Sequence, residues 1–92
     1  MYVDFICNEV GISRELFFSK SRKTRYSLPR YMFYYICIQR PMTINHILDF
    51  MVSCNFKVTR QNIENGIKKI EENEDKDLWI LINACLEEFE NE

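Results

Sequence analysis

The chain has 92 residues, of which 47% are hydrophobic and 14% aromatic, and its formal net charge is −2. This composition excludes an intrinsically disordered tail and is typical of one small domain with a single hydrophobic core. Only two Gly and two Pro are present, fewer turn residues than small sheet proteins usually contain, so we expect an all-α fold.

The small net charge hides two strongly opposed blocks. Residues 1–13 carry two acids, residues 14–60 carry nine bases and two acids (net +7), and residues 61–92 carry three bases and ten acids (net −7). A concentrated positive block attracts polyanions, because each phosphate contact releases condensed counterions. The alternative is that the two blocks form ion pairs with each other inside the molecule.

The N-terminal part of the chain predicts two short helices. Apolar residues at helical spacing indicate a first helix over residues 2–9, which Gly11 ends. Ser13 is a suitable N-cap for a helical turn over residues 14–18. This turn should bring two apolar side chains toward the core, those of Leu16 and Phe17.

A basic segment follows. Residues 17–30, FFSKSRKTRYSLPR, hold five basic residues and no acid, and their Ser and Thr content predicts a polar, irregular loop. We expect the next helix to start at Ser27 or Leu28, with Pro29 in its first turn, where a missing N–H costs nothing. Its apolar sequence predicts a central helix, covered on most sides and ended by Pro41.

Three more helices are predicted in the second half. Thr43 should cap a helix that runs to about Ser53, and a turn at residues 54–58 (CNFKV) leads to a second cap at Thr59. The helix over residues 60–73 that follows has as its inward face Ile63, Gly66 or Ile67, and Ile70. A charged break then precedes a helix from Asp77 to about Glu90, whose apolar residues are Leu78, Leu81, Ile82, Cys85, Leu86 and Phe89.

Nothing in the sequence predicts catalysis or a cofactor. The four cysteines lack C-x-x-C spacing, the only histidine is His46, and the two glycines are 55 residues apart. These residues make no zinc site, catalytic triad or phosphate loop. We expect free thiols in a reducing cytoplasm, with association to the nucleoid. No signal peptide and no bilayer-spanning segment are predicted.

The two helices around the CNFKV turn have the layout of a helix-turn-helix, in which the first turn of the second helix enters the major groove. In that turn, four residues are candidates for base contacts: Thr59, Arg60, Gln61 and Asn62. Arg pairs with guanine, and Gln or Asn with adenine, through two hydrogen bonds each. The alternative is a polar cap followed by ordinary solvent-facing residues.

Two segments together resemble the C-terminal DNA-binding domain (domain IV) of the bacterial chromosomal replication initiator DnaA, a TrpR-like helix-turn-helix domain. The family's L-x-S-K-S-R-K segment and the helix after it are matched in order by Leu16, Ser19, Lys20, Ser21, Arg22, Lys23, Pro29 and Arg30. The family's recognition helix is matched in VTRQNIENGIKKIEE by Ile63, Gly66, Lys68, Lys69, Ile70 and Glu71. The resemblance spans about residues 1–73 and leaves residues 74–92 as an acidic C-terminal helix, packed on or extending the same domain.

The resemblance implies an all-α domain of five or six helices that binds double-stranded DNA. The phosphate contacts would come from the basic loop and the helix after it, through Lys20, Arg22, Lys23, Arg25 and Arg30. The family's Asp-His-Thr-Thr-Val run is replaced by residues 59–63, which changes the base-reading chemistry. The chain has no ATPase module, so we expect a divergent stand-alone or excised relative that acts in replication initiation or its regulation.

A second hypothesis is a protein-interaction module that kept the fold and binds a replication protein or another partner. The candidate surfaces are the basic loop, for an acidic partner, and the acidic C-terminal helix, for a replication protein or a homodimer. Trp79 is the candidate contact residue of that helix, and its alternative role is packing in the core.

Overall fold

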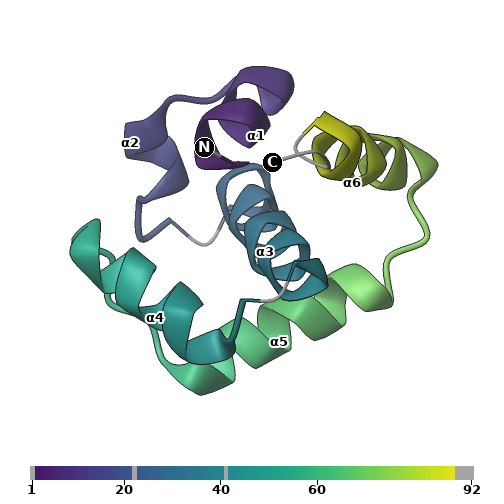
Figure 1. The fold of residues 1–92 in the computed structure, drawn as a ribbon. Coiled ribbons are helices and arrows are strands. Elements are labelled where there is room, and N and C mark those ends of the chain that lie inside the picture. Colours follow the sequence, from purple (N-terminus) through teal and green to yellow (C-terminus); the bar gives the residue numbers. More distant parts are fainter. Residues whose placement is uncertain (1, 22, 41, 89–92) are drawn as a thin grey trace.

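The computed structural model describes residues 2–21, 23–40 and 42–88, and over these ranges the fold is all-α. Six helices are formed (Figure 1): α1 (Tyr2–Val10), α2 (Arg14–Phe17), α3 (Thr24–Gln39), α4 (Ile44–Ser53), α5 (Arg60–Glu71) and α6 (Lys76–Glu88). The predicted fold class is therefore confirmed. None of the helices in the described ranges is long and apolar enough to cross a bilayer.

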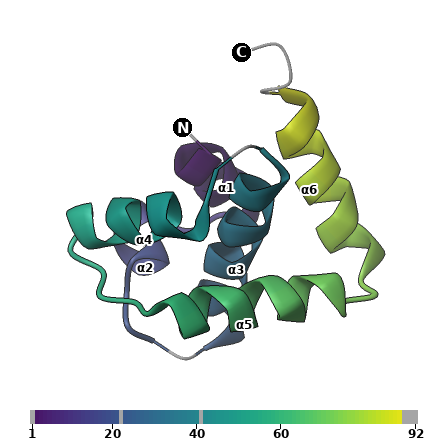
Figure 2. The same ribbon diagram turned by 60° about the horizontal axis from the view of Figure 1, so that its bottom comes forward.

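Helix α3 is the centre of the domain and contacts each of the other five helices. Figure 2 shows α5 crossing below α3, with α4 and α6 on either side. The hydrophobic effect explains this position, because α3 carries the longest apolar run of the chain. Its buried residues are Ser27, Pro29, Arg30, Met32, Phe33, Tyr34, Ile36 and Cys37.

The predicted start of α3 was wrong. The N–H groups of Tyr26 and Ser27 both donate to the carbonyl of Lys23, at 2.9 and 3.0 Å, so the helix begins at Thr24. Pro29 consequently lies inside the helix and not in its first turn. A proline at this point removes one helical hydrogen bond, and its burial in the core offsets part of that cost.

Local capping signals were read correctly. Ser13, Thr43 and Thr59 each accept a hydrogen bond from a backbone N–H three residues ahead. Gly11 ends α1 with a φ of 74°, in the left-handed region that glycine enters without strain. Leu16 was misplaced, because it is 38% exposed while its neighbour Phe17 is fully buried.

The turn between α4 and α5 is built around Asn55, whose φ is 62°. The N–H of Phe56 donates to the carbonyl of Met51, and that of Asn55 to the carbonyl of Val52, both at 2.9 Å. These two bonds form a Schellman motif, with Asn in the place that Gly usually takes. The motif turns the chain so that Phe56 enters the core.

Gly66 is the inward-facing small residue of α5. A Cβ at this position would lie 2.6 Å from Tyr31 Cδ1 on α3, closer than side-chain atoms can approach. The glycine therefore allows α5 to lie directly against the central helix, while Ile67 is only partly buried.

Helix α6 packs on α1 and α3 through Leu78, Ile82 and Cys85. Trp79 is partly buried: its ring meets Tyr35 edge-on at 5.4 Å between centroids, and its Nε1 donates to the carbonyl of Asn73 at 2.7 Å. Trp79 is thus a packing residue. Among the residues that the structure describes, the most exposed large hydrophobic residue is Ile80, at 66%.

Candidate nucleic-acid interface

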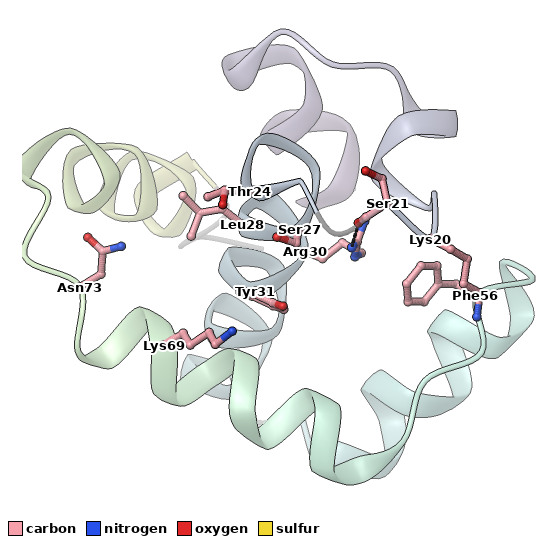
Figure 3. Close-up of a pocket in the computed structure, with 10 residues that line it drawn as sticks. All are labelled: Lys20, Ser21, Thr24, Ser27, Leu28, Arg30, Tyr31, Phe56, Lys69 and Asn73. Atoms are coloured by element: carbon pink, nitrogen blue, oxygen red, sulfur yellow. Dashed lines mark hydrogen bonds between the residues drawn. The ribbon is translucent and has the colours of Figure 1, made fainter.

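A basic groove lies between the loop after α2 and helix α5. It consists of two adjoining hollows of about 490 and 660 Å³, which share Lys20, Arg30 and Lys69. Five basic residues and one acid line it: Lys20, Arg30, Lys57, Lys68 and Lys69, with Glu72. In Figure 3, Lys20 and Phe56 lie at one end, Lys69 reaches in from α5, and Arg30 and Tyr31 on α3 lie between them.

Arg30 forms the floor of this groove and is only 6% exposed. Its Nη1 donates to the carbonyls of Phe17 and Ser19, both at 2.9 Å, and its Nη2 to that of Ser21 at 3.2 Å. The guanidinium also lies 4.9 Å from the centroid of the Phe56 ring. Arg30 therefore holds the backbone of the preceding loop in place, and its predicted phosphate contact stays a prediction.

The charge of Arg30 has no carboxylate partner within the described ranges. Burial lowers the pKa of its guanidinium, and the neighbouring Tyr34 and Tyr31 act in the opposite direction. An arginine stays protonated under any ordinary condition. The floor of the groove therefore carries a positive charge that contributes to the attraction of anions.

Lys20 connects the basic loop to the turn between α4 and α5. Its Nζ donates to the carbonyl of Lys57 in the α4–α5 turn at 3.2 Å, and lies 5.0 Å from the centroid of the Phe56 ring. The two segments are 37 positions apart in sequence and together form one wall of the groove. The predicted contribution of Lys20 to a basic surface is consistent with this geometry.

The opposite wall comes from the second half of α5, through Lys68 and Lys69. Both side chains are exposed, and Lys69 Nζ lies 5.4 Å from the centroid of the Tyr31 ring. Lysines in a last helical turn also stabilise the helix dipole, a role that does not require a ligand. Lys57, Lys68 and Lys69 were not predicted as site residues, although the KK pair about two turns after Asn62 was a usable signal.

The four predicted base-contacting residues are all exposed, but two of them serve the helix cap. Thr59 Oγ1 accepts from the N–H of Asn62 at 3.1 Å, and Asn62 Oδ1 accepts from the N–H of Thr59 at 3.3 Å. Arg60 Nη1 donates to Asn45 Oδ1 at 2.5 Å, and Gln61 Nε2 to Asn65 Oδ1 at 3.0 Å. Arg60 and Gln61 therefore lie outside the cap, and Asn65, the partner of Gln61, is an exposed polar residue that was not among the predicted four.

The remaining predicted phosphate contacts are not all brought together. Lys23 is the exposed N-cap residue of α3. Arg25 is exposed and lies 5.4 Å from the Tyr26 ring, beside a separate hollow. Arg22 lies outside the described residues. The basic groove thus contains Lys20, Arg30 and Asn62 of the predicted set.

The two charged blocks do not neutralise each other through close ion pairs. Over residues 2–21, 23–40 and 42–88, the one ion pair joins Arg14 and Asp4 at 3.0 Å, near the N-terminus. No base of residues 14–60 is paired with an acid of residues 61–88 in these ranges. The positive charge of the groove is therefore available to a ligand.

No protein-family model matches the chain, and no curated protein or solved structure matches it significantly. The resemblance to the DNA-binding domain of DnaA therefore stays a prediction.

Proposed function

We propose that the chain binds double-stranded DNA through α5 and the basic groove. The observation that carries this proposal is the position of the groove: its walls are the basic loop on one side and α5, the second helix of the α4–α5 pair, on the other. In a helix-turn-helix the second helix enters the major groove, and this is the role proposed for α5. A role in replication initiation or its regulation rests on the sequence resemblance.

In this proposal the first turn of α5 contacts bases and its last turn contacts phosphates. The first turn, with Arg60 and Gln61, would meet base edges, and Asn65 lies one turn further on the same face as Gln61. The lysines at the other end would contact the phosphates that flank the groove. Because Thr59 and Asn62 are engaged in the cap, we expect modest sequence preference and a large electrostatic share of the affinity.

The proposal is tested by measuring binding to a fluorescent duplex by anisotropy at several salt concentrations. Each lysine that contacts a phosphate contributes about one unit to the slope of log K against log salt. The double variant Lys68→Gln/Lys69→Gln should bind all sequences more weakly and reduce the slope by about two units. Lys76→Gln, at the start of α6 and outside the groove, is the matched control and should leave the slope unchanged.

Absence of binding even at low salt would contradict the proposal. It would favour the second hypothesis, a protein-interaction module that binds an acidic partner through the same groove. Selection from a random duplex library then separates specific from non-specific binding, since Arg60→Ala should abolish any preference for a guanine without changing the salt slope.

A further inference from the structure

A third hollow, which is mainly apolar, lies where the end of α1 meets the first turns of α3 and α6. Its volume is about 460 Å³, within the range of pockets that bind ligands. Its floor is apolar and is formed by Val10, Ile12, Leu28, Pro29, Met32, Leu78 and Leu81.

The rim of this apolar hollow is charged. Asp75 and Asp77 lie on the α6 side and Arg25 on the α3 side. Asp75 Oδ1 accepts from the N–H of Asp77 at 2.9 Å, and neither carboxylate is in an ion pair within the described ranges. Two unpaired carboxylates next to an apolar floor favour an occupant that presents apolar side chains together with positive charge.

Helix α6 also exposes two apolar residues that lie outside the hollow, Ile80 and Ala84. At 3.6 residues per turn, Ile80 lies about 60° and Ala84 about 20° around the helix from Asp77. Both are exposed, and Ile80 is the most exposed large hydrophobic residue of the described chain, at 66%. A small molecule in the hollow would leave Ile80 uncovered, whereas a longer element laid along α6 would cover it.

We propose that this face binds an amphipathic helix of a partner protein, with apolar residues on one side and Lys or Arg beside them. Helix-in-groove binding uses apolar anchors at i, i+3, i+4 and i+7, which suits an apolar hollow on a helix that also exposes Ile80 and Ala84. A symmetric dimer would bring together two copies of a rim that carries two carboxylates and one guanidinium, and this net negative charge makes a second copy a less favourable occupant than a basic helix.

The proposed site adjoins the basic groove without overlapping its lysines. Thr24, in the first turn of α3, lines both hollows. A partner helix at this site would lie next to the loop that forms one wall of the groove. The site does not depend on DNA binding, and its test requires none.

The test uses two synthetic helical peptides, one with Leu at i, i+3, i+4 and i+7 and Lys elsewhere, and one with Glu in place of Lys. Each peptide carries a fluorescent label at one end, and the anisotropy of the label measures binding. The Lys peptide should bind and shift the methyl NMR signals of Met32, Leu78 and Leu81. Equal binding of the Glu peptide, no binding of either, or shifts confined to another face would overturn the proposal.

Two neutralised variants supply the control. Asp75→Asn/Asp77→Asn keeps the local hydrogen-bonding groups and should weaken Lys-peptide binding about fivefold, since it removes two exposed charge pairs. Asp49→Asn/Glu64→Gln removes two exposed carboxylates from α4 and α5 and should leave binding unchanged. Equal weakening by both variants would show only non-specific charge attraction. If the protein sediments as a dimer and the Lys peptide does not dissociate it, the face is assigned to a second copy of the chain.

Discussion

Replacing Arg30 tests whether this residue holds the basic loop in place. Its guanidinium donates three hydrogen bonds to the carbonyls of Phe17, Ser19 and Ser21 while only 6% of the residue is exposed. Lysine keeps the charge but lacks the planar fork that spans three acceptors. Methionine keeps much of the volume and removes both the charge and the donors.

Arg30→Lys should lower the free energy of unfolding by about 2 kcal/mol, because at least one hydrogen bond to a charged donor is lost. Arg30→Met should cost about 3 kcal/mol: all three bonds are lost, but the desolvation of a buried charge is recovered. For a domain of this size, these changes lower the melting temperature by on the order of 10 °C.

Urea unfolding followed by Trp79 fluorescence measures the free energies. Amide hydrogen exchange at Ser19, whose N–H donates to the carbonyl of Leu16 at 3.1 Å, reports on the loop. Exchange should become faster in both Arg30 variants and stay unchanged in Lys23→Gln, which removes an exposed charge from the same segment. If Arg30→Lys unfolds at the wild-type urea concentration and exchanges at the wild-type rate, Arg30 does not position the loop.

Three further predictions concern the fold. Asn55→Ala should destabilise the protein by about 1 kcal/mol through left-handed strain at φ 62°, while Asn55→Gly should be nearly neutral; equal urea midpoints for the two variants would contradict this. Gly66→Ala should cost about 1 kcal/mol net, because the Cβ would lie 2.6 Å from Tyr31 Cδ1 and overpacking outweighs the gain in helix propensity; a raised melting temperature would show that Tyr31 moves freely. Burial raises the pKa of Cys37 to about 12 and that of Cys85 to about 11, from 9.0. Above about pH 9 these thiols lose their protons in the unfolded chain but keep them in the folded protein. The free energy of unfolding should therefore be constant up to about pH 9 and decrease above it. A free energy that stays constant to about pH 10.5 would contradict the burial of these thiols.

The parts of the fold that sequence predicted well are those decided locally. The caps at Thr43 and Thr59 depend on hydrogen bonds to residues three positions away, so the residue types alone indicate them. The start of α3 is not decided in this way. Thr24 to Leu28 join the helix ahead of Pro29 because Ser27 and Pro29 pack in the core, a tertiary effect that outweighs proline's usual place in a first turn.

The candidate site was predictable only in part, because it forms where distant segments meet. Lys20 stood out within a basic stretch of sequence. The acceptors of Arg30 lie 9 to 13 positions before it, and no pattern in the sequence distinguishes an arginine that binds carbonyls from one that faces solvent. Lys57 and Lys69 become neighbours of Lys20 only after α5 has packed on α3.

The most direct test of the central claim is an NMR titration of the protein with a duplex of mixed sequence at about 100 mM salt. DNA binding through the groove predicts that amide shifts concentrate in residues 19–24 and in α5, while the outer face of α6 is unaffected. If the duplex produces no shifts, or shifts only outside these two segments, the groove is not a DNA-binding surface.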